Sequence, residues 1–444
     1  MIKIINTLSD FNINKSIGPH SIPNLMLHLI KHIIAEPLAI MINLSFETGT
    51  FIEKLKTGKI VPIFKETGNN LNHCNYRPIS LLSNINKLIE KLMYTRLYTF
   101  LLKFNCIYDL QFGFRQGHST VHALINLTED IRSALDHSNF AVGVFVDLQK
   151  AFDTVDHNIL LNKLEVYGIR GITNQWFKSY FNNRKQFVSI EGICSEEAIL
   201  HYGVPQGSVL GPLLFLIYIN DLHSTIKFCT TRHFADDTNL LIKNKSLKQL
   251  KKRLNLDLRN LCNWLKSNKI SLNASKTKLI IFRHPNKTVN YNLKVKIDGK
   301  KLLPSTHVKY LGIIIDQHLN WSYHTDYISA KLSRSVGMLS KIRHYVNVHT
   351  LRMIYYGIFS STLTYAAQIW GQIQNQHINR VIKLQDRAIR IINFARYCDS
   401  RNPLYLKSNI LKFNDNLNLL NFLFVYDSLK CNLPSIFNKN IYVY

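Results

Sequence analysis

Three aspartates occur where apolar strand-like segments end, and their types and spacing suit the chemistry of divalent cations. Asp236 and Asp237 interrupt a run of apolar and β-forming residues, which predicts a strand, a tight Asp-Asp turn and a second strand. Asp147 directly follows the nearly unbroken apolar run 140–146, which is typical of a buried central strand. If these strand ends adjoin, two carboxylates about 4 Å apart repel by about 4 kcal/mol at an effective dielectric near 20. Such a cluster must bind either protons or cations.

Carboxylate oxygens are hard ligands of the kind that Mg²⁺ prefers. Two such ions held about 4 Å apart by shared carboxylates carry out in-line phosphoryl transfer. The three aspartates therefore predict a site for phosphoryl transfer.

Around these residues, the hydrophobic pattern predicts the elements that position them. An apolar helix is expected over 25–46, and leucines at three- and four-residue spacing predict an amphipathic helix over 247–265. Asp156 precedes a helical pattern that stops at Gly168, so we assign it to an N-cap and assign Asp153 to turn structure. The breaker-rich segment 203–208 opens a further helix. From about Tyr327 onward the pattern is helical.

Five short motifs occur in order between Asn75 and Asp237. They are NYRPISLL at 75–82, QFGFR with GHST at 111–120, DLQKAFD at 147–153, GVPQGS at 203–208 and FADD at 234–237. Together they resemble the reverse transcriptase of non-LTR (LINE-type) retrotransposons, most closely the jockey-like group, over roughly residues 15–393. The resemblance implies an α+β right-hand polymerase, with fingers, a palm of antiparallel sheet packed by helices, and a helical thumb. We expect an N-terminal extension and the fingers in 1–139, the palm with some fingers elements in 140–326, and the thumb with C-terminal helices in 327–444.

The resemblance also implies an activity and a set of partners. A reverse transcriptase of this kind extends a DNA primer 3′-hydroxyl with dNTPs on an RNA template. In it, Asp147, Asp236 and Asp237 would hold two Mg²⁺ ions, for which Mn²⁺ can substitute, and Lys276 would lie near the leaving pyrophosphate. A lysine there can act as a general acid or as a charge clamp, whereas an exposed turn lysine is the alternative. The endonuclease domain that such elements usually encode is not expected in this sequence, so a separate endonuclease activity stays an open possibility.

Further residues match positions that bind the nucleotide and the template in the family. Arg77 and Arg115 are candidates for phosphate contacts, because a guanidinium makes paired hydrogen bonds to phosphate oxygens; a surface arginine is the alternative. Phe152 matches the aromatic residue that excludes a 2′-hydroxyl by filling its space, although an aromatic residue after a strand can also be plain core. Gln206 and Gly207 lie in the positioning motif, where small residues allow a close backbone approach.

The charge of the chain points to a polyanionic partner. Lysine and arginine number 55 against 28 acidic residues, which gives a formal charge of +27. Four cationic residues near the C-terminus are spaced three, four and three apart, which places them on one helix face that can follow a phosphate backbone. An ordinary solvated face is the alternative. These residues are Arg380, Lys383, Arg387 and Arg390.

Other classes of protein are disfavoured. Seven scattered cysteines show no paired spacing, so they predict neither a zinc site nor a disulfide framework, and we expect reduced, mostly buried thiols. The apolar run 209–219 is too short to span a bilayer, and no signal-peptide pattern follows Met1, so we expect no membrane partner. The expected location is intracellular, and the resemblance implies a ribonucleoprotein of the cytoplasm and nucleus.

Three rival interpretations stay open. An RNA-templated RNA polymerase would share the metal chemistry, but Phe152 argues against it. A catalytically inactive nucleic-acid-binding or maturase-like remnant of a retroelement is the main alternative, and the intact acids argue against it. The third is a relic that is rarely or never expressed. Under each of these interpretations, the basic surface predicts RNA or DNA binding that weakens steeply as the salt concentration rises.

Overall fold

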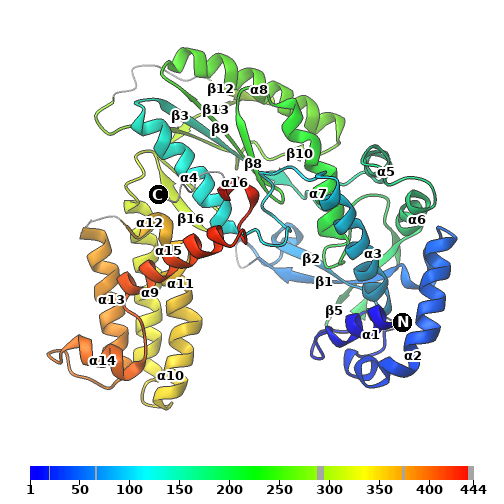
Figure 1. Cartoon of the computed structure of the whole chain (residues 1–444), viewed down its shortest axis with the longest axis horizontal. Coiled ribbons are helices and arrows are strands. Elements are labelled where there is room, and N and C mark those ends of the chain that lie inside the picture. The colour runs from blue at the N-terminus through cyan, green and yellow to red at the C-terminus, as the bar shows by residue number, and fades with distance from the viewer. Residues whose placement is uncertain (20, 66–67, 288–294, 373–375, 439–444) are drawn as a thin grey trace. The chain divides into compact units, whose positions relative to one another are not determined.

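The computed structural model describes residues 1–19, 21–65, 68–287, 295–372 and 376–438, and the chain forms two compact units (Figure 1). The first comprises 1–114, 147–227 and 259–273 and contains the segment around Gln206; we call it the loop unit. The second comprises 115–146, 228–258 and 274–444 and contains Asp236 and Asp237; we call it the hairpin unit. Each unit combines helices with β-sheet, so the predicted α+β class is confirmed.

The loop unit is built on a small mixed sheet with the strand order β2-β1-β5-β6, in which β7 also pairs with β5. β1 runs antiparallel to β2 and parallel to β5. The strands of the loop unit are β1 (Thr57–Phe64), β2 (Tyr76–Leu81), β4 (Leu148–Gln149), β5 (Lys185–Ile190), β6 (Ile193–Cys194), β7 (Ala198–Ile199) and β10 (Ser271–Leu272). Of these, β4 and β10 form a separate two-stranded sheet. Its helices are α1 (Ile2–Ser9), α2 (Asn24–Glu47), η1 (Glu53–Leu55), η2 (His73–Asn75), α3 (Asn84–Lys103), α5 (His157–Val166), α6 (Ile172–Phe181), α7 (Gly211–Ile219) and η3 (Asn220–Thr225).

Local sequence signals explain where several of these helices begin and end. The Asp156 side chain caps α5 by accepting a hydrogen bond from the backbone N–H of Ile159 at 3.0 Å, as predicted. Gly168 follows α5 with φ +94°, a conformation that favours glycine. Pro212 lies in the first turn of α7, where its missing N–H costs nothing. The predicted helix over 25–46 is α2.

The hairpin unit contains the palm-type sheet, with the strand order β14-β11-β3-β9-β8. β11, β3, β9 and β8 are antiparallel neighbours, and β14 lies parallel to β11. Every residue of β3 is buried, as its unbroken apolar sequence predicts. The strands are β3 (Phe140–Val146), β8 (Thr230–Phe234), β9 (Asp237–Asn244), β11 (Lys278–Phe282), β12 (Val295–Ile297), β13 (Lys300–Leu302), β14 (Pro304–Ser305), β15 (His307–Tyr310) and β16 (Ile313–Asp316).

Helices of the hairpin unit share one apolar core with this sheet, which includes Trp321, Leu332, Tyr355, Trp370 and Val381. The helical region begins at Ser322, five residues before the predicted point, and α9 lies beside α13 (Figure 1). The helices are α4 (Thr120–Asp136), α9 (Ser322–Ile342), α10 (Val348–Ile354), η4 (Tyr355–Ser360), α11 (Ser361–Thr364), α12 (Ala367–Trp370), α13 (Gln376–Ile392), α14 (Arg401–Ser408), α15 (Phe413–Leu429) and α16 (Ser435–Asn438).

One helix, α8 (Leu247–Ser267), has residues in both units. All six leucines that predicted it are buried, which confirms the amphipathic pattern. These are Leu247, Leu250, Leu254, Leu258, Leu261 and Leu265.

The thiols differ from expectation. Cysteines 74, 194, 398 and 431 are exposed, and the other three are partly exposed, so the prediction of mostly buried thiols is wrong. The apolar run at 209–219 forms a buried helix of the loop unit. Within the described ranges, every helix is too short or too polar to cross a bilayer.

Candidate active site

Asp147 and Asp237 adjoin two residues that face each other across neighbouring strands. The register of β3 and β9 pairs Val146 with Thr238. Asp147 follows Val146 in the chain and Asp237 precedes Thr238, while Asp236 lies in the turn before β9. Among the described residues, no group of three or more His, Cys, Asp or Glu side chains is arranged to hold a metal ion. Metal binding by the three aspartates therefore stays a prediction.

The turn that carries the acids is one residue earlier than predicted. Phe234 pairs with Asp237, so the two turn residues are Ala235 and Asp236 rather than the two aspartates. Strand pairing overrides the turn preference of the Asp-Asp dipeptide, because Asp237 joins the ladder of β9. Ala235 is buried with φ +56°, which costs a non-glycine residue about 1 kcal/mol. Strain of this kind is concentrated at functional sites.

A network of charged groups, partly buried at Asp130 and Lys243 and fully buried at Arg232, joins both strands of this hairpin to α4. On β8, the Arg232 side chain is 1% exposed, forms an ion pair with Asp130 and donates to Asn126 Oδ1 at 2.5 Å. On β9, Lys243 Nζ lies 2.6 Å from the other oxygen of Asp130. Burial raises the pKa of Asp130, but Arg232 and Lys243 outweigh burial and hold that pKa below its usual value. One carboxylate thus fixes both strands behind the acidic turn.

The sequence alone did not single out this network. No prediction was made for Asp130 or Arg232. The sequence shows Arg232 between Thr231 and His233, but the burial of these central strand residues is known only from the structure. A charged side chain inside a buried strand requires a partner.

Three further side chains have defined surroundings near the tip of the hairpin. His233 Nδ1 and Thr238 Oγ1 lie 3.0 Å apart between β8 and β9, and both residues are buried. Tyr310 is buried at the end of β15, with its ring centroid 5.1 Å from that of Phe145. Burial raises the pKa of Tyr310, and the charge of Asp237 raises it further. The Tyr310 hydroxyl therefore lies within the electrostatic field of a predicted catalytic acid.

In the loop unit, backbone hydrogen bonds hold the predicted positioning motif. The N–H of Gly203 donates to Val155 O at 2.7 Å, and that of Val204 donates to Phe152 O at 2.9 Å. The N–H of Ser80 on β2 donates to Gln206 O at 2.7 Å. The structure thus brings together three of the predicted motifs: those at 75–82, 147–153 and 203–208.

Gln206 and Gly207 have defined surroundings in this loop. The Gln206 side-chain amide donates from Nε2 to Asp153 Oδ1 at 2.8 Å, so Asp153 has a partner beyond the turn role predicted for it. Burial raises the pKa of Asp153, although this hydrogen bond opposes the shift. Gly207 has φ +119°, and a Cβ there would lie 2.5 Å from Ser80 O. Only glycine permits this close approach of two backbones.

Phe152 packs in an aromatic cluster of the loop unit. Its ring stacks on Phe215 of α7 with centroids 4.5 Å apart, and it meets the edge of Phe114 at 5.9 Å. The residue is only partly buried. The Phe152 ring therefore packs on Phe215 and Phe114 while part of it reaches solvent. These surroundings are compatible with both predicted roles, exclusion of a 2′-hydroxyl and packing in the core.

The remaining predicted contacts lie on both units. Arg77 is exposed on β2, opposite Ile63 of β1. Arg115 is half-buried at the start of the hairpin unit, and Lys276 is exposed just before β11. Their roles toward phosphate stay predictions.

The predicted basic stripe forms one face of α13. Arg380, Lys383 and Arg387 are exposed and Arg390 is half-buried, while apolar residues such as Val381 pack into the core. Arg380 lies 3.6 Å from Asp326, and the Arg390 guanidinium lies 5.6 Å from the centre of the Tyr397 ring. The division of α13 into a packed face and a basic face is therefore confirmed.

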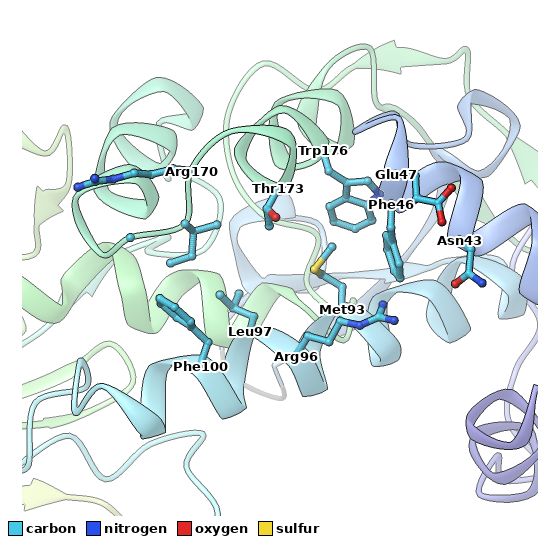
Figure 2. A pocket seen from close by; sticks show the side chains of 12 residues that line it. Asn43, Phe46, Glu47, Met93, Arg96, Leu97, Phe100, Arg170, Thr173 and Trp176 are labelled. Atoms are coloured by element: carbon cyan, nitrogen blue, oxygen red, sulfur yellow. The ribbon is translucent and has the colours of Figure 1, made fainter.

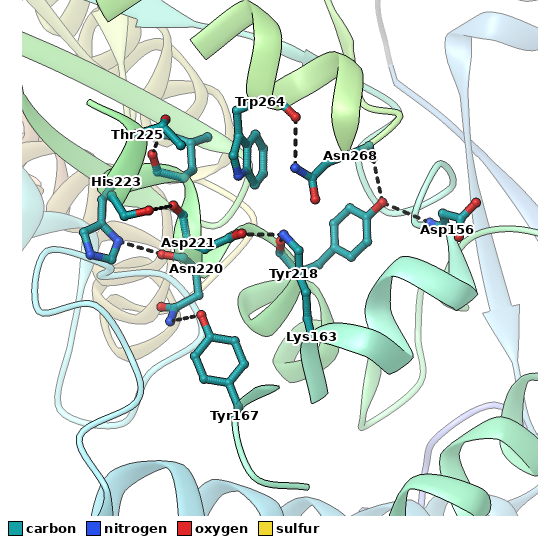
Figure 3. A network of polar contacts seen from close by, with 12 residues as sticks. Asp156, Lys163, Tyr167, Tyr218, Asn220, Asp221, His223, Thr225, Trp264 and Asn268 are labelled. Carbon is teal, nitrogen blue, oxygen red and sulfur yellow. Dashed lines mark hydrogen bonds and ion pairs between the residues drawn. The ribbon is translucent and has the colours of Figure 1, made fainter. Parts of the chain in front are cut away.

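A polar network fixes the far end of α7 (Figure 3). Lys163 Nζ donates to Tyr218 O and to Asp221 Oδ1, both at 2.6 Å, and the Tyr218 hydroxyl donates to Asn268 O at 2.6 Å. Burial lowers the pKa of Lys163, against the effect of Asp221, and raises the pKa of Tyr218 to about 12. The helix that follows the positioning loop is thus held rigidly at its C-terminal end.

A pocket of about 530 Å³ lies between α2, α3 and α6 of the loop unit (Figure 2). Its lining is mainly apolar and includes Met93, Phe100 and Trp176. Arg96 and Phe46 both line the pocket, and the Arg96 guanidinium lies over the Phe46 ring, 4.6 Å from its centre. The pocket contains none of the predicted site residues.

Comparisons with known proteins agree with these observations. The family model described as reverse transcriptase (RNA-dependent DNA polymerase) matches residues 65–315, more than half of the chain. A probable RNA-directed DNA polymerase from transposon BS of Drosophila melanogaster is 30% identical over 437 residues, which cover 92% of this chain and 46% of the relative. The RNA-directed DNA polymerase from mobile element jockey of the same species is 28% identical over 428 residues, covering 94% of this chain and 46% of the relative.

The chain thus spans about half the length of these curated relatives. A solved structure of apo telomerase from Candida tropicalis, truncated from the C-terminal domain, matches at 15% identity with a TM-score of 0.42. That match covers 59% of this chain and 54% of the telomerase chain. The family model and the jockey relative confirm the resemblance inferred from the five motifs. With its palm-type sheet and ordered motifs, the chain belongs to the reverse transcriptase (RNA-dependent DNA polymerase) family.

Proposed function

We propose that this chain is an RNA-directed DNA polymerase that extends a primer 3′-hydroxyl with dNTPs on an RNA template. The observation that carries the proposal is the register of β3 and β9 in a member of the reverse transcriptase family. Because Val146 pairs with Thr238, the neighbouring Asp147 and Asp237 belong to adjoining strand ends. Carboxylates that follow and precede paired strand ends suit cation-assisted phosphoryl transfer once both bind the same ions.

Reverse transcriptases use divalent metal ions, and we infer two Mg²⁺ ions, replaceable by Mn²⁺, held by Asp147, Asp236 and Asp237. The donor set fits, because it consists of carboxylate oxygens, which hard cations prefer. Such ions, when bound, lower the pKa of a hydroxyl nucleophile and neutralise charge on a triphosphate.

The other predicted residues would act on the substrates directly. Gln206 and its loop would position the base pair and the incoming nucleotide, and Phe152 would exclude a 2′-hydroxyl by filling its space. Arg77 and Arg115 would contact phosphate oxygens. Lys276 would stabilise or protonate the leaving pyrophosphate.

Primer extension tests this proposal. Purified protein with a primed RNA template, dNTPs and Mg²⁺ should extend the primer, whereas the Asp236→Asn variant should not. RNA binding by the variant should stay equal to that of the wild type, because Asn keeps the shape of the side chain. No extension by the wild type, under conditions where a related enzyme is active, would refute the proposal and favour an inactive nucleic-acid-binding protein.

The deoxyribonucleotide preference is tested separately at Phe152. Phe152→Ala should raise the relative use of ribonucleotides by about 10- to 100-fold, because shape discrimination of one small group is worth about 1–3 kcal/mol. Phe46→Ala is a matched control, since it also removes a packed ring of the loop unit, beside Trp176. Equal ribonucleotide use by both variants would assign Phe152 to the core alone.

The basic face of α13 is tested by salt dependence. Replacing Lys383 and Arg387 by Gln should reduce the slope of log affinity against log salt by about 0.7–0.9 for each lost phosphate contact. Replacing the exposed Lys248 and Lys252 of α8 by Gln removes the same charge elsewhere and serves as the control. A slope that falls equally in both double variants would make the α13 face an ordinary solvated surface.

A further inference from the structure

Glu90 is a fully buried acid in the loop unit that none of the predicted roles uses. It lies on the inner face of α3 and is 0% exposed. Glutamate is almost never buried without partners, because an unpaired charge away from water is costly. Its partners therefore indicate what keeps it there.

Both oxygens of Glu90 accept hydrogen bonds. The Tyr180 hydroxyl of α6 donates to Oε1 at 2.7 Å, and the backbone N–H of Val209 donates to Oε2 at 2.6 Å. The backbone N–H of Leu210 also interacts with the carboxylate. Burial raises the pKa of Glu90, while Arg184, Tyr180 and these N–H groups oppose that shift. A carboxylate that accepts at both oxygens is matched to its ionised form.

A buried cation accompanies the acid. Arg184 is 1% exposed, and its guanidinium lies 4.4 Å from the centre of the Tyr180 ring. Its Nη1 donates to Tyr180 O at 3.3 Å, whereas Nη2 is buried without a hydrogen-bond partner in the described part of the chain. The charge of Glu90 compensates this cation, so removing Glu90 would leave Arg184 buried and unbalanced.

The backbone that Glu90 holds is the end of the positioning loop. Val209 lies two residues after Gly207 and three after Gln206. The Tyr180 hydroxyl also interacts with the Ser208 side chain. The first half of the loop is fixed by hydrogen bonds to Val155 and Phe152, and Gln206 O is fixed by Ser80. Glu90 supplies the anchor on the other side, where the chain enters α7.

We propose that Glu90 is a positioning residue that, with Tyr180, fixes the Gln206–Gly207 backbone for binding of the incoming nucleotide. The proposal rests on the proposed function, because the nucleotide is the substrate assigned there. The loop backbone lies against β2 at Gly207, where a Cβ would be 2.5 Å from Ser80 O, and Gln206 O accepts the N–H of Ser80. A small shift at Val209 should therefore reach Gln206.

Two substitutions of graded severity test this role. Glu90→Gln removes the charge but keeps one oxygen acceptor, and Glu90→Met removes both acceptors at similar volume. Asp386→Asn is the matched control, because Asp386 is also a buried carboxylate with a tyrosine and an arginine partner. Tyr405 Oη donates to it at 2.9 Å and Arg401 Nη1 lies 2.8 Å away, both within the hairpin unit. Should Glu90→Met fail to fold, Glu90→Gln decides.

The first measurement is hydrogen exchange of the peptide that covers 203–210, which does not depend on catalysis. Exchange should accelerate about tenfold or more in Glu90→Gln, and further in Glu90→Met, because hydrogen bonds to charged acceptors are the strong ones. Asp386→Asn should leave exchange in this peptide unchanged even where it lowers thermal stability. Equal exchange in wild type and Glu90→Gln would overturn the proposal.

The second measurement is steady-state primer extension. Glu90→Gln should raise KM for dNTPs about tenfold with a smaller change in kcat, whereas Asp386→Asn should leave KM unchanged. An unchanged KM in Glu90→Gln, together with accelerated exchange, would reduce Glu90 to a purely structural residue and refute the positioning role. Absence of extension by the wild type would instead contradict the proposed polymerase activity, while the exchange result would still decide whether Glu90 anchors the loop.

Discussion

The hairpin with Asp236 is held by a partly buried carboxylate and the loop with Gln206 by a fully buried one, and the partners of the two carboxylates differ. Asp130 behind the hairpin meets the side chains of Arg232 and Lys243, two full positive charges on two strands. Glu90 behind the loop accepts hydrogen bonds from the Tyr180 hydroxyl and the backbone N–H of Val209, and the charge of the buried Arg184 also acts on it. The pKa of Asp130 is accordingly lowered, whereas burial prevails at Glu90 and raises its pKa.

The difference follows from what each carboxylate must hold. The hairpin is a pair of strands, and an ion pair from each strand to Asp130 of α4 can hold it in place. The loop is held through its backbone. Gln206 O accepts a hydrogen bond from Ser80 of β2, the N–H of Val209 donates to Glu90, and Gly207 packs against Ser80 without a side chain. We therefore expect the hairpin to depend on charge, and the loop on shape and hydrogen bonding.

The largest expected effect separates chemistry from positioning. Asp147→Asn should lower kcat about 100- to 1000-fold, because the loss of a carboxylate that holds the metal ions weakens the electrostatic stabilisation of the transition state. Gln206→Ala should instead raise KM for dNTPs about tenfold, by the loss of about one hydrogen bond to a bound partner. Single-turnover primer extension measures both. Comparable losses of kcat in the two variants would break the proposed division of labour.

Stability should depend strongly on charge behind the hairpin. Asp130→Asn should lower the free energy of unfolding by about 3 kcal/mol, because it leaves Arg232 buried without its counter-charge. Glu129→Gln is the control on the adjacent residue, whose exposed pair with Arg132 at 2.7 Å should contribute about 0.5 kcal/mol or less. Urea unfolding measures the difference. If both variants unfold alike, the network does not hold the hairpin.

Backbone changes should affect stability strongly in the loop and weakly in the hairpin. Gly207→Ala should destabilise the protein by about 2 kcal/mol, because its Cβ would lie 2.5 Å from Ser80 O and φ is +119°. Ala235→Gly should change stability by less than about 1 kcal/mol, since glycine relieves the strain at φ +56° while losing a buried methyl group. Thermal unfolding of both variants tests this contrast. A tolerated Gly207→Ala would show that the loop can move away from β2.

The smallest effect is a pH dependence of opposite sign at the two carboxylates. The lowered pKa of Asp130 contributes stability that is present above the unfolded pKa near 3.8 and is lost as pH falls through the folded pKa. The raised pKa of Glu90 favours the folded state below the unfolded pKa near 4.5, and this contribution disappears as pH rises through the folded pKa.

Urea unfolding of the wild type, Asp130→Asn and Glu90→Gln between pH 3 and 7 would measure both dependences. The stability difference between wild type and Asp130→Asn should shrink toward acid, and that between wild type and Glu90→Gln should grow toward acid. Parallel pH profiles of the two variants would contradict the assigned partners.

The sequence by itself determined the local elements and the order of the motifs. Apolar runs and breakers defined β3 with Asp147 after it, the caps of α5, and the leucine face of α8. These features are local, since hydrophobic periodicity and turn chemistry act within a few residues. The same local reasoning misplaced the turn at Ala235 by one residue, because pairing with β8 decides that register.

Tertiary structure decided which charges are buried and what they hold. Glu90 meets Val209 across 119 residues of sequence, and Asp130 meets Arg232 across 102. Neither acid stands out in its own helix, because a charged residue on an amphipathic helix is normally solvated. The exposure of cysteines such as Cys74 was likewise decided by the fold. Burial is a property of the packed chain, so these anchors became visible only when distant segments were brought together.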